Sequence, residues 1–106
     1  MTMTPFSQVC CWYASQCNGQ WEHEYGIKIE TLDNPGWSVE IDLAHTDLER
    51  AVLEKQLVEV PGRCWHFAEI RDKKFHGACD PDSLEIVLDI FLRLMDERDL
   101  GPSLDS

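Results

Sequence analysis

The chain has 106 residues, 43% of them hydrophobic, and this length and composition are typical of one folded domain. Its 20 Asp and Glu residues outnumber its 9 Lys and Arg residues, which gives a formal net charge of -11. This charge argues against nucleic acids and anionic membrane surfaces as partners, because both require a basic face. We expect a single domain over residues 1–106, with an ordered core over about residues 5–98.

The cysteines follow no ladder of disulfide spacings, and no N-terminal stretch resembles a signal peptide. Their odd number favours reduced thiols and a cytoplasmic location. No apolar run approaches the roughly 20 residues that would span a membrane. The five cysteines are Cys10, Cys11, Cys17, Cys64 and Cys79.

A first helix is expected over about residues 5–17. Thr4 suits the N-cap and Pro5 the first helical position, while Asn18-Gly19 is typical of a helix end. We expect the two thiols of its apolar stripe to be buried as small hydrophobic groups. That stripe consists of Phe6, Val9, Cys10, Tyr13 and Cys17.

Alternating hydrophobic residues predict two strands, over 25–32 and 37–43, joined as a hairpin. The connection contains Pro35-Gly36, which suits the centre of a type II turn. Facing residues of a hairpin share one side of the sheet, so Ile29 must oppose Val39 or Ile41. This requires a loop of three residues (34–36) or five (32–36). The outer face is then net acidic and carries Lys28, Glu30, Ser38, Glu40 and Asp42.

The second half of the chain is expected to begin with a short helix at the capping box Thr46–Glu49. A strand at residues 57–60 follows, and then a hairpin of residues 64–71 and 74–79. Trp65 and Phe67 would point to one face of this hairpin, while Ile70 and Phe75 would point to the other. The sequence therefore leaves open a bulge or partial cover of both faces.

A last helix is expected to start at Asp80-Pro81, with a wide apolar stripe from Leu84 to Met95. The predicted fold class is α+β. It is an antiparallel sheet of about four to five strands with an N-terminal and a C-terminal helix packed on it. The predicted order is α-β-β-(short helix)-β-β-β-α.

Cys64, His66 and Cys79 are the best candidates for a metal site, because they would share one face of the second hairpin. His76 would lie on the opposite face, and no CxxC pair is present to anchor a tetrahedral site. We expect no metal and no other cofactor. A metal-stabilised interaction module remains an alternative function.

A small enzyme that uses a cysteine or an acid/base pair, for example a thiol enzyme of the sulfur-transfer type, is a second alternative. Cys79 lies just before the last helix, where the helix dipole favours a thiolate, but the carboxylates that follow it oppose ionisation. Glu22 and His23 are acid/base candidates, and in a strand Glu22 and Glu24 would share a face. We expect no enzyme activity and assign no catalytic residue.

Three segments together resemble the bacterial immunity protein 53 family. They are Cys17-Asn18-Gly19-Gln20-Trp21-Glu22-His23, Tyr25-Gly26-Ile27-Lys28-Ile29 and Thr31-Leu32-Asp33-Asn34-Pro35-Gly36-Trp37. The similarity extends over about residues 6–96, but the chain departs from the family pattern over residues 44–63, where the sequence indicates a helical stretch. The resemblance implies an α+β fold and a protein that protects the producing bacterium by binding a toxin. It implies no catalytic residue, toxin identity or cofactor.

We therefore expect an immunity protein that neutralises a cognate protein toxin by covering its basic surface. Trp21 fits the anchor of such an interface, and the alternative is that Trp21 belongs to the core. The sequence leaves the oligomeric state open. The expected contact residues are Trp21, Glu22, His23, Glu24, Glu30, Asp33, Asn34, Glu40 and Asp42.

Overall fold

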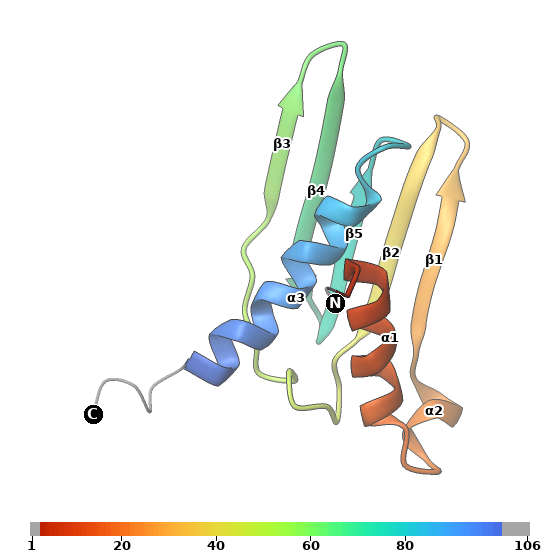
Figure 1. Ribbon diagram of the computed structural model, residues 1–106, viewed down its shortest axis with the longest axis vertical. Coiled ribbons are helices and arrows are strands. Elements are labelled where there is room, and N and C mark those ends of the chain that lie inside the picture. Colours follow the sequence, from red (N-terminus) through yellow and green to blue (C-terminus); the bar gives the residue numbers. More distant parts are fainter. Residues whose placement is uncertain (1–2, 101–106) are drawn as a thin grey trace.

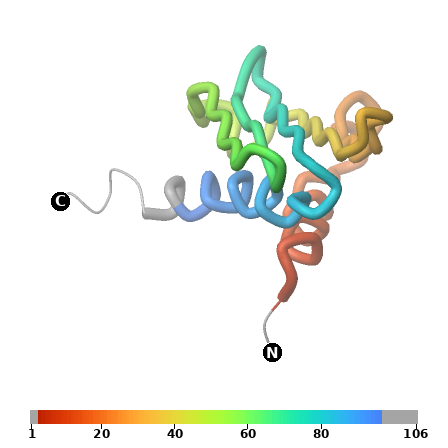
Figure 2. The backbone as a smooth tube through the Cα atoms, turned by 90° about the horizontal axis from the view of Figure 1, so that it is seen from above, coloured from red at the N-terminus to blue at the C-terminus, as the bar shows by residue number. Residues whose placement is uncertain are grey.

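The computed structural model of the chain describes residues 3–100, apart from the side chains of residues 97–100. Its five strands form one antiparallel sheet in the order β1-β2-β5-β4-β3, and the helices α1 and α3 lie on the same face of this sheet (Figures 1 and 2). The predicted α+β fold is confirmed. The elements are α1 (Pro5–Gln16), α2 (Trp21–Glu24), β1 (Ile27–Leu32), β2 (Gly36–Asp42), β3 (Gln56–Val60), β4 (Cys64–Arg71), β5 (Lys74–Cys79) and α3 (Leu84–Leu100).

Helix α1 begins as predicted, because the Thr4 hydroxyl accepts a hydrogen bond from the Ser7 amide at 3.1 Å. Its buried stripe differs from the expected one. Val9 and Trp12 are buried, whereas Cys10 is exposed and Cys17 is half-buried, so the prediction of two buried thiols is wrong. The indole of Trp12 offers far more apolar surface than a thiol, and its burial sets the rotation of the helix.

The hairpin of β1 and β2 confirms that the apolar residues of the two strands share one face, since Ile29 pairs with Val39. This pairing has the register predicted for the five-residue loop (32–36). One further pair, between Leu32 and Gly36, extends the ladder, so that residues 33–35 form the loop. Gly36 therefore belongs to β2 and not to a type II turn. A Cβ atom at Gly36 would overlap the carbonyl oxygen of Cys79, so glycine is required for the close approach of β2 to β5.

The face of the sheet under the helices holds the core. Ile41 and Phe75 are completely buried there, and the Phe91 ring of α3 packs edge-to-face on Phe75 with 5.5 Å between ring centroids. Gly77 lies directly beneath Val87, whose Cγ1 atom would overlap a Cβ atom at Gly77. The core is therefore built by α1 and α3 packing on one side of the sheet (Figure 2).

The opposite face of the sheet, here called the open face, faces away from α1 and α3. The β4–β5 ladder is regular from Arg71 and Lys74 onward, so the second hairpin contains no bulge. Trp65 and Phe67 accordingly lie on the open face, where both are half-buried. The Lys55 ammonium group lies 5.9 Å from the centroid of the Phe67 ring and covers part of this apolar spot.

The short helix predicted after Thr46 is absent, and residues 44–50 form consecutive turns instead. The capping box is only half formed. The Thr46 hydroxyl accepts a hydrogen bond from the Leu48 amide at 3.0 Å, but the Glu49 carboxylate accepts from the His45 amide and from the Lys73 ammonium group. Glu49 is thus drawn to the β4–β5 turn rather than to its own helix start, and no helix propagates.

Helix α3 begins at Leu84, later than the predicted start at Asp80-Pro81. The Asp80 side chain does not cap the helix itself. Its buried carboxylate accepts hydrogen bonds from the Trp65 amide at 3.0 Å, the Asp82 amide at 3.1 Å and the Ser83 hydroxyl. These bonds fasten β4 to the turn that precedes α3. The bond from Ser83 above all, followed by that from Trp65, holds the pKa of Asp80 below its ordinary value.

Candidate functional site

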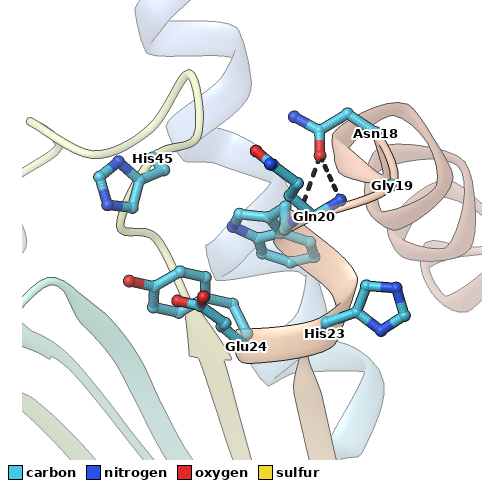
Figure 3. Close-up of a pocket in the computed structure, with 8 residues that line it drawn as sticks. Asn18, Gly19, Gln20, His23, Glu24 and His45 are labelled. Carbon is cyan, nitrogen blue, oxygen red and sulfur yellow. Dashed lines mark hydrogen bonds between the residues drawn. The ribbon is translucent and has the colours of Figure 1, made fainter.

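A hollow of about 570 Å³ opens where the loop after α1, the helical turn α2 and the turn after β2 meet (Figure 3). It is open to solvent and combines aromatic rings, imidazoles, amides and one carboxylate. It includes three of the expected contact residues. Its lining consists of Asn18, Gly19, Gln20, Trp21, His23, Glu24, Tyr25 and His45.

The rim of the hollow is shaped by hydrogen bonds within residues 18–22. The Asn18 side-chain oxygen accepts from the Gln20 amide at 3.0 Å and the Trp21 amide at 2.9 Å, drawn as dashed lines in Figure 3. The Glu22 carboxylate accepts from the amides of Asn18 and Gly19, both at 2.9 Å. Hydrogen bonds from its own amide and from these two amides lower the pKa of Glu22. Glu22 therefore shapes the loop and is a poor general base.

These bonds also start the helical turn α2, so residues 21–24 are not extended. The prediction that Glu22 and Glu24 lie side by side on a strand face is therefore wrong, because the Asn18 side chain binds the backbone amides at the start of this helical turn. Glu24 faces the same side as His45, whereas His23 lies on the other side of α2 (Figure 3). Glu24 is thus the carboxylate at this hollow whose oxygens are not bound to the loop.

The back wall of the hollow is aromatic. Trp21 is only 4% exposed, and its indole N–H donates to the Ala44 carbonyl at 3.0 Å. The Tyr25 ring stacks on it with 6.1 Å between centroids, and the His45 ring lies 5.6 Å from Tyr25. Trp21 is therefore a core residue, the alternative raised above, and it supports the half-buried Tyr25 and the exposed His45.

The remaining predicted contact residues lie in two other places. Asp33 and Asn34 are in the β1–β2 loop, at the end of the hairpin away from α2 (Figure 1). Glu30, Glu40 and Asp42 lie on the open face. A strand of this length extends about 20 Å, so the α2 residues and the β1–β2 loop are not parts of one compact site.

The predicted contact carboxylates of the open face differ in exposure and in their hydrogen bonds. The Asp42 side chain is 20% exposed, and its oxygens accept from the Gly26 amide at 2.9 Å and lie 3.7 Å from the Lys74 ammonium nitrogen. Asp42 therefore closes the hairpin, so although it lies on the outer face as predicted, it is not a freely exposed contact residue. Glu40 lies 3.7 Å from His76 Nδ1, and Glu30 is exposed. Of the three carboxylates predicted to contact a partner on this face, Glu30 and Glu40 are therefore more available than Asp42.

The candidates for thiol and metal chemistry occupy unsuitable environments. Burial, together with the charge of Asp80, raises the pKa of Cys79 to about 11, so this thiol stays protonated and is not a nucleophile at neutral pH. His66 pairs with Cys79 across the sheet, as their predicted common face requires. Within residues 3–96, however, no group of three or more His, Cys, Asp or Glu side chains is arranged to hold a metal ion.

Sequence reasoning missed the contribution of His45 to the hollow. His45 adopts a left-handed backbone conformation, with φ of 63°, in the turns that follow β2. It reaches the hollow because the Ala44 carbonyl is fixed by the Trp21 indole. A contact between residues this far apart in the chain has no local sequence signal.

Comparison with known proteins gives one family. The chain matches the family described as immunity protein 53 over residues 6–96. No curated protein and no solved structure matches it. In the part of the chain that the structure describes, none of the helices combines the length and apolar character needed to cross a membrane. The family match covers most of the chain and includes the segments around Trp21 and Trp37, and the chain therefore belongs to the immunity protein 53 family.

Proposed function

We propose that this immunity protein neutralises a cognate toxin by binding it at the hollow beside α2, within the producing cell. The observation that carries the proposal is the position of the exposed Glu24 carboxylate beside the rings of Tyr25 and His45 in an open hollow. A carboxylate next to aromatic faces suits the guanidinium group of an arginine, through a charge-assisted hydrogen bond and stacking. We expect the toxin to present such a residue on a basic surface.

The charge of the chain supports the same partner. A net charge of -11 creates a field that attracts a basic protein over distances beyond direct contact. On the open face, Glu30 and Glu40 add to this field on the β1–β2 hairpin. These carboxylates are expected to speed association rather than to hold the complex together.

The proposed mechanism is occlusion, without chemistry on the toxin. The buried Cys79 thiol and the hydrogen-bonded Glu22 carboxylate are both poorly placed for catalysis. Neutralisation should accordingly require about one immunity protein per toxin molecule. Titration of toxin activity with the purified chain tests this, and complete inactivation by a small fraction of an equivalent would indicate an enzyme instead.

The contact surface is tested by charge reversal at Glu24. Glu24→Lys should weaken binding to the cognate toxin by about tenfold or more, because it places a cation where the toxin's cation binds. Asp89→Lys, an exposed position on α3, reverses the same charge outside the hollow and serves as the matched control. Equal affinities of the two variants would exclude the hollow as the contact site. Trp21 is not suitable for this test, because its removal would disturb the core.

A further inference from the structure

Strand β3 forms one edge of the sheet and is exposed on both of its faces. Its apolar side chains remain accessible: Leu57 is 58% exposed, Val58 48% and Val60 42%. The strand lies at the side of the sheet, with its upper part beyond α3 (Figure 1). Among the residues that the structure describes, no further strand pairs with β3, and an apolar edge strand of this kind is a template for pairing with another chain.

The backbone groups of β3 that face outward can be identified from two hydrogen bonds of β4. The Asp80 backbone amide donates to the Trp65 carbonyl at 3.1 Å on the β5 side of β4. The Ile70 backbone amide donates to the Leu53 carbonyl at 3.0 Å on the β3 side. Even-numbered residues of β4 therefore bond toward β3. Because these residues pair with Gln56, Val58 and Val60, the N–H and C=O groups of Leu57 and Glu59 point away from the sheet.

We propose that β3 pairs antiparallel with β3 of a second copy of this chain, across a two-fold axis at Leu57. Each Leu57 then exchanges both backbone hydrogen bonds with Leu57 of the second copy, and the two five-stranded sheets become continuous. The pairing brings the two exposed Leu57 side chains side by side on the open face. It leaves the hollow beside α2 free, because α2 lies at the β1 side of the sheet, at the edge opposite to β3 (Figure 1).

The register follows first from the direction of the backbone groups. A two-fold axis placed between two residues would bring outward-facing groups opposite groups already bonded to β4, so the axis must pass through a residue. Charge then selects the residue. An axis at Leu57 places Lys55 opposite Glu59 of the second copy, twice by symmetry. An axis at Glu59 would instead place the two Glu59 carboxylates opposite each other. An axis at Val58 would place neither Lys55 nor Glu59 opposite a residue of opposite charge.

The position of Lys55 fits this pairing. Its ammonium group lies near Phe67, which is the cross-strand partner of Leu57, so Lys55 is on the open face. Glu59 is two residues from Leu57 in the same strand and therefore lies on the open face as well. The edge is also electrically balanced, since residues 54–63 contain two acids, Glu54 and Glu59, and two bases, Lys55 and Arg63. The excess negative charge of the chain is located elsewhere.

A charge-swap cycle tests both the association and its register. The dissociation constant of the full chain is measured by analytical ultracentrifugation. Lys55→Glu or Glu59→Lys alone should raise the dissociation constant by about tenfold or more. Each substitution gives residues 55 and 59 of the two copies the same charge, and this pair occurs twice across the axis. The double variant should restore it to within about threefold. Residues four apart in a strand are too distant to pair within one copy, so this rescue can only arise between copies.

Leu57→Lys places two lysines on the axis and should give a monomer of unchanged circular dichroism spectrum. The matched control is Phe6→Lys on α1, which removes an equally exposed apolar side chain and should leave the dimer intact. A wild-type chain that stays monomeric at the highest concentration reached overturns the proposal. So does a dimer that is insensitive to the single charge reversals, or one that the double variant fails to restore. None of these measurements involves the toxin, so their outcome is independent of the proposed function.

Discussion

The two faces of the sheet are made by alternate residues of the same strands, yet they have opposite properties. In β2, Val39 and Ile41 are buried under the helices, while Glu40 between them lies on the open face. The helix-covered face gains its stability from apolar area removed from water, which needs no particular partner geometry beyond close packing. The open face carries charges that interact with one another only weakly.

The ion pairs of the open face illustrate this weakness. Arg71 and Glu69 are 3.8 Å apart, and the pairs formed by Lys74 with Asp42 and by His76 with Glu40 are 3.7 Å apart. Such partly exposed pairs contribute roughly 0–1 kcal/mol each. The comparison indicates that substitutions on the open face can alter binding with little effect on folding, whereas those on the covered face cannot.

The largest effect is expected for Phe91→Ala at the centre of the covered face. Phe91 is completely buried and packs edge-to-face on Trp12, with 5.0 Å between ring centroids. Its truncation should lower the free energy of unfolding by about 3–5 kcal/mol, measured by urea denaturation. Phe6→Ala removes the same ring from a position that is 54% exposed and should change it by less than about 0.5 kcal/mol. Equal effects would show that α3 does not pack as described.

An intermediate effect is expected for Asp80, which joins β4 to the turn before α3. Because its pKa is lowered in the folded state, its contribution to stability is present above the ordinary value of 3.8 and is lost as the pH falls through the folded pKa. Asp80→Asn should therefore lower the melting temperature at pH 7 and reduce the loss of stability on acidification to pH 2. Asp82→Asn, at an exposed neighbouring carboxylate, is the control. An unchanged acid profile for Asp80→Asn would contradict this role.

The smallest effect is expected for Glu40→Gln on the open face. The substitution keeps the shape of the side chain and removes only the charge near His76, so the free energy of unfolding should change by less than about 0.5 kcal/mol. Association with the toxin at low salt should nevertheless become slower, and added salt should abolish the difference. A loss of stability comparable to that of Phe91→Ala would remove the distinction between the two faces.

The elements predicted correctly are those with strong local patterns. The alternation over residues 25–43 determined the first hairpin, and the parity of Ile29 and Val39 narrowed its loop to two lengths. The candidate site was predicted less well. Trp21 and Glu24 do line one hollow, but Asp42 and Glu22 are engaged in hydrogen bonds to the backbone. The Asp42 bond to Gly26 depends on the pairing of β1 and β2, whereas the Glu22 bonds are local and depend on the turn formed by residues 18–22.

The sequence by itself determined which strands exist, which of their residues face the core, and how acidic the surface is, because alternation and charge are local properties of the chain. Only the tertiary structure decided two further features: the rotation of α1 and the absence of a helix after Thr46. In both cases a distant contact competed with a local preference. Trp12 packs on Phe91, and Glu49 binds Lys73. A local pattern specifies an element only until such a contact outweighs it.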